Sequence, residues 1–228
     1  MLLSIVIPVY NEKNTVSDII KKIDSLPTSL NRELIIVDDG STDGTREILK
    51  SLESRSDVKL IYKESNSGKG DSLKLGFKNS KGDYVIVQDA DLEYEPEDYF
   101  KLLEAIDGKD NTIIYGSRFM GHYEEMSPLH YYGNKFLTSI TNILYGVALS
   151  DMETCYKLFP GNFIRSLNLK ANRFDFEPEI TAKVLKSGYK IIEVPIRYYG
   201  RKHSEGKKIT WKDGFNAIYS LVKYKFND

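Results

Sequence analysis

Short apolar runs alternate with amphipathic segments along the first half of the chain. The apolar runs cover residues 2–9, 33–39, 58–62, 83–89 and 112–117. A run that is apolar at almost every position is typical of a strand buried on both faces of a sheet. The pattern therefore predicts five buried strands that are connected through intervening helices.

Amphipathic helices are predicted between these runs. After the first run, one face of a helix is formed by Val16, Ile19, Ile20, Ile23 and Leu26. Thr15 and Asp18 precede this face with the spacing of a capping box. Similar stripes follow the later runs. Strands that alternate with helices in this way give an α/β fold, with a mostly parallel central sheet and helices on both of its faces.

The second half of the chain is less regular. Residues 131–146 and 176–188 have helical periodicity, and residues 155–159 and 189–199 are predicted strands. We find no internal repeat, low-complexity segment or linker. The sequence therefore predicts a single domain over residues 1–228.

A last apolar stripe recurs at helical spacing near the end of the sequence and consists of Trp211, Phe215, Ile218, Val222 and Phe226. Lys212, Lys223 and Lys225 lie alongside it. Two interpretations of this amphipathic C-terminal helix stay open. It packs on the core, or it lies at the surface of a bilayer.

The charge of the chain is close to neutral but unevenly distributed. A net charge of −1 over 228 residues argues against a general nucleic-acid-binding protein. Residues 197–225, however, contain eight Lys and Arg side chains against two acidic ones. Such a segment suits phosphates or an anionic surface, and a solvated basic face is the alternative.

Cys155 is the single cysteine, which excludes an internal disulfide and fits a reducing compartment. Its apolar neighbours favour a small core residue over a nucleophile. The first apolar run is too short for a membrane span and lacks the features of a signal peptide, and no later run reaches the ~18 apolar residues of a span. We therefore expect a cytoplasmic protein, either soluble or in peripheral contact with the inner face of the membrane.

The predicted strand 83–89 ends in the acidic sequence "QDADLE". In sheets of this type, ligands bind beyond the carboxyl ends of the strands. Asp89 and Asp91 point to the same side of an extended chain, and Glu93 continues that parity. Three carboxylates on one side repel one another unless a cation neutralises them, and all-oxygen ligands suit Mg²⁺ or Mn²⁺. A solvated acidic turn is the alternative.

Two other loops carry candidate binding groups. In "VDDGSTDGT", Asp38 or Asp39 could accept hydrogen bonds from a base or a ribose. The Gly-rich loop "NSGKGDS" (66–72) brings Lys69 to the start of a helix, where backbone amides can face an anion. Lys69 is therefore a candidate for donor binding, although the loop lacks the spacing of a P-loop.

Taken together, the motifs "SIVIPVYNE", "ELIIVDDGSTDGT", "DYVIVQDADLEYEPED" and "YGSRF" resemble the nucleotide-sugar half of a family 2 glycosyltransferase. The second half, with "DMETCYKLF" and "RKHSEGKKITWKDG", resembles the branch of that family that makes dolichol-phosphate and polyprenyl-phosphate sugars. The resemblance covers nearly the whole chain. It implies a GT-A fold with a Rossmann-like sheet, in which residues 1–119 bind the nucleotide sugar and residues 120–228 bind the acceptor.

The resemblance also implies the residues of the donor site. Those expected to line the nucleoside pocket are Pro8, Tyr10 and Glu12. Those expected to contact the base are Val37 and Asp39. Those expected to contact the ribose, the diphosphate and the metal are Asp89, Ala90 and Asp91. Glu93 stands where relatives of this branch often have Gln, and it is the expected third metal ligand.

Basic residues are implied for the phosphates. Arg118 of "GSRF" is expected to bind a phosphate. Arg201 and Lys207 map onto contacts with the donor diphosphate and the acceptor phosphate, and Lys208 is the alternative to Lys207. The expected catalytic residues are Asp91, Asp151, Arg201 and Lys207.

The implied reaction is inverting transfer of a sugar from a GDP- or UDP-linked donor to a polyprenyl or dolichyl phosphate, with Mg²⁺ or Mn²⁺ as cofactor. A lipid phosphate is anionic at neutral pH and needs positioning more than a base. The alternative acceptor is a hydroxyl of a glycan, lipopolysaccharide or protein, for which Asp151 is the candidate base. A sugar-nucleotide-binding protein without turnover is a second alternative. A lipid acceptor would be reached peripherally or through a membrane protein partner.

Overall fold

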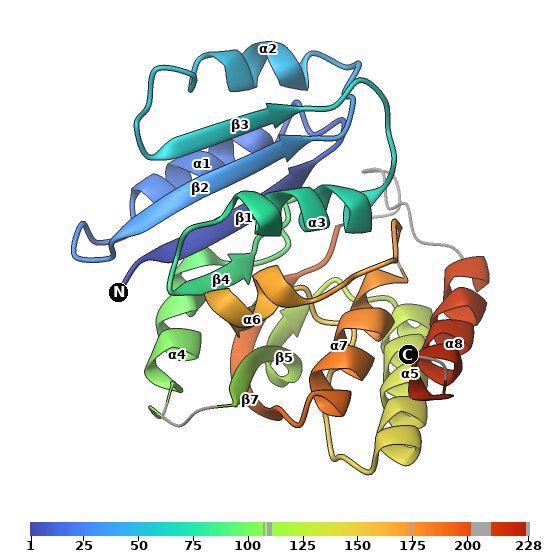
Figure 1. Cartoon of the computed structure of the whole chain (residues 1–228). Helices are drawn as coiled ribbons and strands as arrows, with labels where there is room; N and C mark the ends of the chain where they lie inside the picture. Colours follow the sequence, from blue (N-terminus) through green and yellow to red (C-terminus); the bar gives the residue numbers. More distant parts are fainter. Residues whose placement is uncertain (107, 109–110, 174, 202–210, 227–228) are drawn as a thin grey trace.

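Seven strands form one twisted sheet in the order β3-β2-β1-β4-β6-β5-β7 (Figure 1). The computed structural model of the chain describes residues 1–106, 108, 111–173, 175–201 and 211–226. The strands are β1 (Leu3–Val9), β2 (Arg32–Asp38), β3 (Val58–Tyr62), β4 (Tyr84–Val87), β5 (Thr112–Glu124), β6 (Lys157–Pro160) and β7 (Lys190–Tyr199). Only β6 runs antiparallel to its neighbours among these strands, which confirms the predicted mostly parallel sheet.

Helices follow most of the strands, as the sequence pattern predicts. They are α1 (Val16–Asp24), α2 (Thr45–Lys50), α3 (Lys69–Asn79), the 3₁₀ helix η1 (Pro96–Asp98), α4 (Tyr99–Glu104), α5 (Pro128–Tyr145), α6 (Gly161–Ser166), α7 (Phe176–Lys186) and α8 (Trp211–Phe226).

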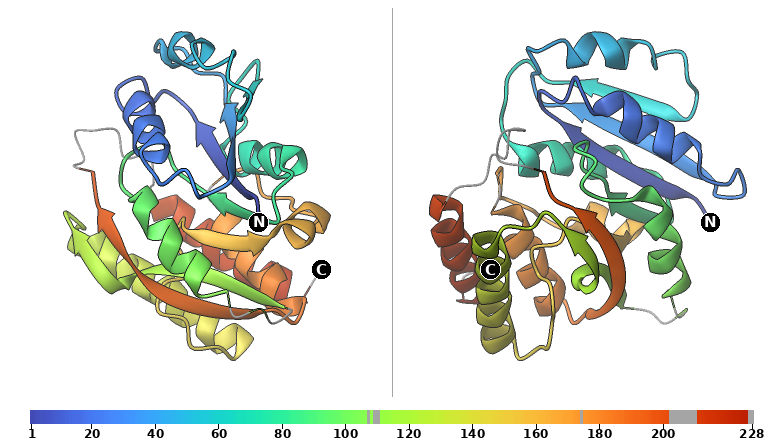
Figure 2. Two further views of the ribbon diagram at one scale, coloured as in Figure 1. Left: turned by 90° about the vertical axis from the view of Figure 1, so that its left-hand side faces the viewer. Right: turned by 180° about the vertical axis from the view of Figure 1, so that it is seen from behind.

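Two hydrophobic clusters cover the two faces of the sheet. One joins Ile5 of β1 to Ile19 of α1 and Tyr99 of α4. The other joins Val6 of β1 to Phe77 of α3 and also includes residues of α6 and α7. The edge view in Figure 2 shows these helices on opposite sides of the sheet. Successive residues of β1 enter different clusters, which explains why this strand is apolar at almost every position.

The direction of β6 decides which loops meet at the site. Because β6 is antiparallel to β4 and β5, its first residue lies at the carboxyl edge of the parallel strands. Residues 151–156, which precede β6, therefore reach the same edge as the loops that follow β1, β2 and β4. β5 continues to Glu124, beyond the predicted end at residue 117, and its pairing with β7 is irregular between Ser117 and His122.

α8 packs on the rest of the protein beside α5 and α7 (Figure 1). Its buried residues, among the side chains that the structure describes, are Ala217, Ser220, Leu221 and Tyr224. Three residues of the predicted apolar stripe face outward instead, because Phe215 is 67% exposed, Val222 is 41% exposed and Phe226 is 71% exposed. The two sets lie on opposite sides of the helix, since 3.6 residues make one turn.

α5 carries an exposed apolar stripe of its own, which consists of Leu129, Tyr132, Phe136 and Ile143. Together, these four residues and the four exposed apolar residues of α8 (Phe215, Tyr219, Val222 and Phe226) are called the apolar stripes below. Nowhere in the described part of the chain is a helix long and apolar enough to cross a membrane.

Candidate active site

Hydrogen bonds join the loops that follow β1 and β2. The Asn11 amide donates to Ser41 Oγ at 3.0 Å, and the Thr42 amide donates to the side-chain oxygen of Asn11 at 2.8 Å. Asn11 has a left-handed backbone with φ of 56°, which Asn tolerates better than most residues. The Glu12 amide donates to Thr45 Oγ1 at 3.0 Å. These bonds hold Glu12 at the carboxyl edge of the sheet.

Thr15 supports Glu12 instead of capping α1. Its hydroxyl donates to the Glu12 carboxylate at 2.9 Å and makes no side-chain cap bond. The predicted capping box of Thr15 and Asp18 is therefore wrong. Asp18 pairs with Lys21 on the exposed side of the helix.

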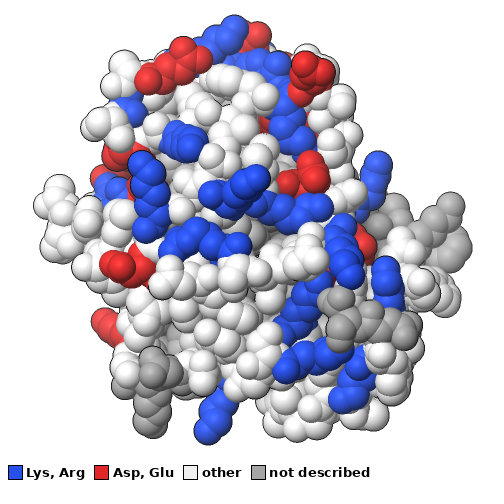
Figure 3. Space-filling model, in the orientation of Figure 1, with Lys and Arg blue, Asp and Glu red and all other residues white. Residues whose placement is uncertain are grey.

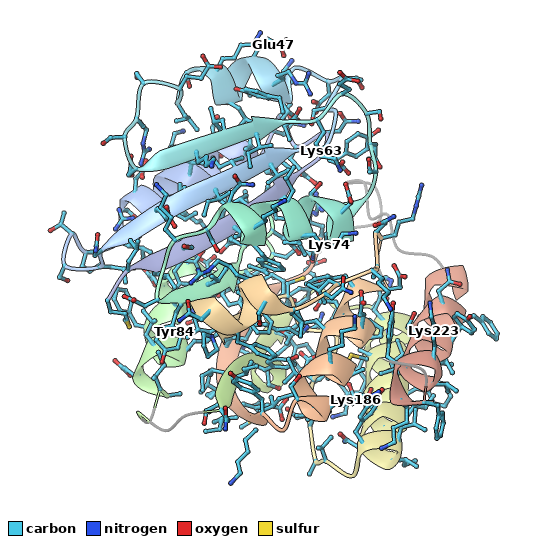
Figure 4. All side chains as sticks on the ribbon, viewed as in Figure 1. Glu47, Lys63, Lys74, Tyr84, Lys186 and Lys223 are labelled. Carbon is cyan, nitrogen blue, oxygen red and sulfur yellow. The ribbon has the colours of Figure 1, made fainter. Side chains whose placement is uncertain are left out.

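Asp39, directly after β2, is 3% exposed and accepts hydrogen bonds on both carboxylate oxygens. Lys63 Nζ donates to it at 2.5 Å, and the amides of Ser67 and Gly68 donate at 3.0 Å and 2.8 Å. Figure 4 shows Lys63 beyond the end of β3. Two amides of the Gly-rich loop thus bind an anion, and that anion is the protein's own Asp39 carboxylate.

The backbone that precedes α7 packs directly against the Gly-rich loop. A Cβ on Gly68, whose φ is 104°, would lie 2.3 Å from the Asn172 carbonyl oxygen. The Asp71 amide donates to the same oxygen at 3.1 Å. A glycine is required at position 68 because both the backbone angle and the close approach exclude a side chain.

Asp89 follows β4 and is held by Lys69 and Cys155. Lys69 Nζ lies 2.8 Å from Asp89 Oδ1 and 3.8 Å from the Glu177 carboxylate, and the Cys155 thiol donates to Asp89 Oδ2 at 2.7 Å. Although burial opposes it, the Lys69 ammonium lowers the pKa of Asp89. Burial, together with the charge of Asp89, raises the pKa of the Cys155 thiol well above its ordinary value. The thiol is therefore a poor nucleophile at neutral pH.

Asp91 and Glu93 lie on a turn. The Glu93 amide donates to Asp91 Oδ1 at 3.2 Å, and Leu92 between them has a left-handed backbone with φ of 64°. The chain is therefore not extended through residue 93. Burial, reinforced by the charges of Asp89 and Glu93, raises the pKa of Asp91 to about 7. A cation that approaches this carboxylate would stabilise its charged form.

Arg201 connects carboxylates from distant parts of the sequence. Its guanidinium lies 3.0 Å from Asp91 Oδ2, 3.2 Å from Glu12 Oε2 and 3.9 Å from Glu93 Oε1. Its amide donates to Glu93 Oε1 at 2.9 Å, and the Tyr198 hydroxyl donates to Glu93 Oε2 at 2.8 Å. The loops after β1, β4 and β7 therefore meet at one guanidinium group.

Arg118 and Asp151 form a buried ion pair. The guanidinium donates to Asp151 Oδ2 at 2.7 Å and to Oδ1 at 2.8 Å, and the Arg118 amide donates to Oδ2 at 3.0 Å. Asp151 is 0% exposed and Arg118 is 6% exposed. The guanidinium also lies over the Tyr198 ring, 5.2 Å from its centre. Both oxygens of the candidate base are thus occupied.

The other expected donor-site residues occupy different environments. Val37 is fully buried and its side chain packs in the core beneath α3. Ala90 is buried in the cluster on the other face of the sheet. Pro8 and Tyr10 are partly exposed at the end of β1 and just after it. Of these four, only Pro8 and Tyr10 have side chains at the surface of the site edge.

Residues 202–210 of the predicted basic segment, which include Lys207 and Lys208, lie outside the described residues. On the face of the molecule that Figure 3 shows, Lys and Arg side chains gather over α7 and α8. Lys186 of α7 and Lys223 of α8 belong to these neighbouring helices (Figure 4).

Several contacts at the site were not predicted from the sequence. Cys155 touches Asp89, Tyr198 binds Glu93, and Glu177 forms a buried ion pair with Lys157 of β6. Glu177 lies in the first turn of α7, where every described residue is buried.

The metal-binding capacity of the site depends on which carboxylate oxygens are free. No group of three or more His, Cys, Asp or Glu side chains that could hold a metal is found within the described ranges. Asp89 accepts hydrogen bonds on Oδ2 and has its Oδ1 in an ion pair with Lys69, and Glu93 accepts hydrogen bonds on both oxygens. Asp91 shares its oxygens with one amide and with Arg201. Mg²⁺ commonly takes one or two protein carboxylates and completes its shell with water and phosphates. The residues therefore fit a metal held by Asp91, with Asp89 beside it, that arrives with a diphosphate.

A family model described as glycosyl transferase family 2 matches residues 4–164. The chain belongs to this family. The matched segment contains β1 to β6 and therefore the loops that carry Glu12, Asp39, Asp89 and Asp91. The family predicted from the sequence motifs is confirmed.

Relatives extend the match to the full chain. The chain is 32% identical to the dolichol-phosphate mannosyltransferase of Pyrococcus furiosus, over 99% of this chain and 65% of that protein. It is 28% identical to a UDP-N-acetylglucosamine–dolichyl-phosphate N-acetylglucosaminyltransferase of Methanococcus voltae, over 98% of this chain and 96% of that protein. The chain thus spans slightly less than two thirds of the Pyrococcus relative's length.

Solved structures confirm the fold. The glucosyl-3-phosphoglycerate synthase of Mycobacterium tuberculosis, crystallised with Mn²⁺, UDP and phosphoglyceric acid, has a TM-score of 0.77 at 18% identity and covers 98% of this chain and 78% of its own. The mannosyl-3-phosphoglycerate synthase of Rubrobacter xylanophilus has a TM-score of 0.71 at 18% identity and covers 98% and 72%. The fold is the GT-A fold of glycosyltransferases, as predicted.

Proposed function

We propose that this domain transfers a sugar from a GDP- or UDP-linked donor to a polyprenyl or dolichyl phosphate, with inversion at the anomeric carbon. The contact of Arg201 with Asp91 and Glu12 is the observation that carries the proposal. A metal would pair with the carboxylates, and the donor diphosphate would pair with the guanidinium. Each charged group of the site therefore has a partner in a complex of donor and metal.

The relatives support the classes of donor and acceptor. By their names, the Pyrococcus protein is a dolichol-phosphate mannosyltransferase and the Methanococcus protein is a UDP-N-acetylglucosamine–dolichyl-phosphate N-acetylglucosaminyltransferase. The mycobacterial synthase was crystallised with Mn²⁺ and UDP. These names favour a nucleoside diphosphate sugar as donor and a lipid phosphate as acceptor, and both are carried over to this chain as part of the proposal.

The Arg118–Asp151 pair favours a phosphate acceptor over a hydroxyl acceptor. A hydroxyl must lose its proton to a base, yet the carboxylate of Asp151 is fully buried and held by Arg118. A phosphate is already an anionic nucleophile and needs no base. Arg118 has more N–H donors than Asp151 uses, so its guanidinium could also contact the acceptor phosphate.

The apolar stripes favour an acceptor that resides in a membrane. Phe136 and Ile143 of α5 and Phe215 and Phe226 of α8 are each at least 60% exposed. Amphipathic helices with large exposed apolar side chains and nearby lysines bind at the surface of anionic bilayers. Lys223 lies on the same helix as Phe226. We therefore include peripheral contact with the inner face of the membrane in the proposal.

The transfer breaks the bond between the anomeric carbon and the donor diphosphate, and it forms a bond to an oxygen of the acceptor phosphate. Negative charge develops on the departing diphosphate. Bound Mg²⁺ or Mn²⁺ would neutralise part of that charge. Arg201 would donate to the diphosphate in place of Asp91 and Glu12, and Lys207 is the predicted second cation. Lys69 keeps Asp89 ionised and in position.

The proposal is tested with the purified protein, Mn²⁺ or Mg²⁺, and a panel of GDP-mannose, UDP-glucose and UDP-N-acetylglucosamine. The acceptors are a short polyprenyl phosphate and the matching free polyprenol, and mass spectrometry detects lipid-linked sugar. We expect product with the phosphate, none with the alcohol, and a loss of about 100-fold or more in Asp91→Asn.

Two outcomes would contradict the proposal. One is transfer to a hydroxyl acceptor with none to any lipid phosphate. The other is metal-dependent nucleotide binding without product from any acceptor, which would indicate a binding protein. Glu104→Gln is the control variant, because Glu104 is exposed at the end of α4 and away from the site edge.

A further inference from the structure

Glu153 lies on the segment that precedes β6, between two residues with known partners. Asp151, two residues before it, is bound by Arg118. Cys155, two residues after it, donates to Asp89. Glu153 is thus placed between the carboxylate on the donor side of the site and the ion pair that we assign to the acceptor side.

One carboxylate oxygen of Glu153 has no hydrogen-bond partner. Its Oε1 atom is buried, and no described group donates to it or accepts from it. A buried polar atom without a partner costs about 1–3 kcal/mol, so native structures rarely keep one without a reason. The residue as a whole is partly exposed, and rotation about its terminal torsion is soft. The carboxyl group can therefore turn toward a ligand.

The cationic side chains near Glu153 donate their hydrogen bonds to other groups. The charges that affect it are those of Glu177, Lys157, Arg118 and Asp151. Lys157 Nζ donates to the Glu177 carboxylate and to the Thr154 carbonyl oxygen, and the Arg118 guanidinium donates to Asp151. The missing partner of Oε1 is therefore not supplied by these neighbours or by any other described residue, so a bound ligand is free to supply it.

The charge state of Glu153 indicates the class of that partner. Burial, reinforced by the charge of Glu177, raises the pKa of Glu153 to about 7. At neutral pH the carboxyl group is protonated part of the time and can both donate and accept a hydrogen bond. This suits a hydroxyl group, which also does both, and it disfavours the anionic oxygens of a phosphate.

We propose that Glu153 binds a hydroxyl group of the transferred sugar and so contributes to the choice of donor sugar. During transfer the sugar lies between the leaving diphosphate and the acceptor phosphate, which is where the neighbours of Glu153 place it. This inference rests on the proposed function. Glu153 is a specificity-determining residue in this assignment, because the bonds that break and form do not involve it.

The test measures two quantities for wild type, Glu153→Gln and Glu153→Ala. The first is the Kd of UDP and of GDP with Mn²⁺, by calorimetry. The second is kcat/KM for the best sugar nucleotide and for its singly deoxygenated analogues. We expect an unchanged nucleotide Kd and a fall of about 10- to 100-fold in kcat/KM for Glu153→Ala, with a smaller fall for Glu153→Gln. For one deoxy analogue, wild type and Glu153→Ala should have the same kcat/KM.

The outcomes separate this inference from the proposed function. If wild type transfers no sugar, both fail. If wild type transfers sugar but Glu153→Ala loses the same factor with every deoxy analogue as with the parent donor, only the sugar-binding role fails. A weaker nucleotide Kd in both variants would likewise overturn it, because it would indicate disruption of the Asp89 side of the site. If Glu153→Ala does not fold, the comparison is made with Glu153→Gln alone, and Glu104→Gln is the control.

Discussion

The Arg118 guanidinium donates to both carboxylate oxygens of Asp151, and neither residue is more than 6% exposed. A buried carboxylate with both oxygens bound by an arginine has a structural role and is not free to act as a base. When one partner of such a pair is removed, the other is left as an uncompensated buried charge. The pair therefore connects the stability of the protein with the acceptor that we propose for it.

Asp151→Asn should lower the free energy of unfolding by about 3 kcal/mol, because Arg118 would lose its counterion in a buried place. Urea denaturation measures this change. Asp18→Asn is the matched control, since Asp18 pairs with Lys21 on the surface and should change stability by less than about 0.5 kcal/mol. Unchanged stability together with loss of turnover in Asp151→Asn would instead identify Asp151 as a catalytic base.

Arg201→Ala should have opposite effects on metal binding and on catalysis. Without nucleotide, Mn²⁺ should bind about tenfold more tightly, because the guanidinium 3.0 Å from Asp91 no longer competes with it. With donor and acceptor present, kcat/KM should fall by about 100-fold, since the diphosphate loses its cation.

Titration of free Mn²⁺ by electron paramagnetic resonance, followed by kinetics on the same samples, checks both effects of Arg201→Ala. Lys22→Ala is the control, because it breaks the ion pair of Lys22 with Glu95 and leaves the carboxylates of the site untouched. Equal Mn²⁺ affinity in wild type and Arg201→Ala would mean that Asp91 is not a metal ligand.

Phe136→Glu combined with Phe226→Glu should weaken binding to vesicles that contain phosphatidylglycerol by at least about tenfold. The reason is that two exposed apolar side chains of the apolar stripes are replaced by anions. Vesicle flotation measures the bound fraction. Ser29→Glu combined with Ser54→Glu adds the same charge at exposed positions elsewhere and should bind like wild type. Equal binding by both double variants would show that the apolar stripes do not face the bilayer.

Glu153 should make stability depend on pH. Its pKa rises from an ordinary 4.5 to about 7 in the folded protein. The stability that comes from the protonated carboxyl is therefore complete below pH 4.5 and is lost as the pH rises through 7. Between pH 5 and pH 8, wild type should lose on the order of 2 kcal/mol relative to Glu153→Gln. Denaturation at both pH values measures this difference, and Glu104→Gln, which keeps Glu153, should depend on pH as wild type does.

The fold could be predicted from the sequence because its main determinants are local. A strand such as β1 is apolar on both faces wherever it is buried by helices, and the loops after β1, β2 and β4 are recognisable from their acids and glycines. The expectation that Asp89, Asp91 and Glu93 lie close together rests on the same kind of pattern. Their mutual effect on the pKa of Asp91 agrees with it.

What could not be predicted depends on contacts between distant segments. Thr15 has the spacing of a cap, but its hydroxyl is used by Glu12. The amides of the Gly-rich loop are suited to an anionic ligand, but in the structure they donate to the Asp39 carboxylate. The local sequence shows which hydrogen bond each of these groups would make on its own. It does not show the residue, distant in the sequence, that binds the group instead. The resemblance implies that Arg201 and Asp91 lie at the same donor diphosphate, but the direct contact of Arg201 with Asp91 and Glu12 was not predicted, for the same reason.

β6 lies between β4 and β5 in the sheet, although it follows both in the sequence. The segments 1–119 and 120–228 are therefore interleaved, and neither contains a complete sheet. A cut between them would divide β5 (Thr112–Glu124) and would leave β4 without its neighbour β6. Exchange of segments between related enzymes at this boundary would thus replace a strand in the middle of the sheet.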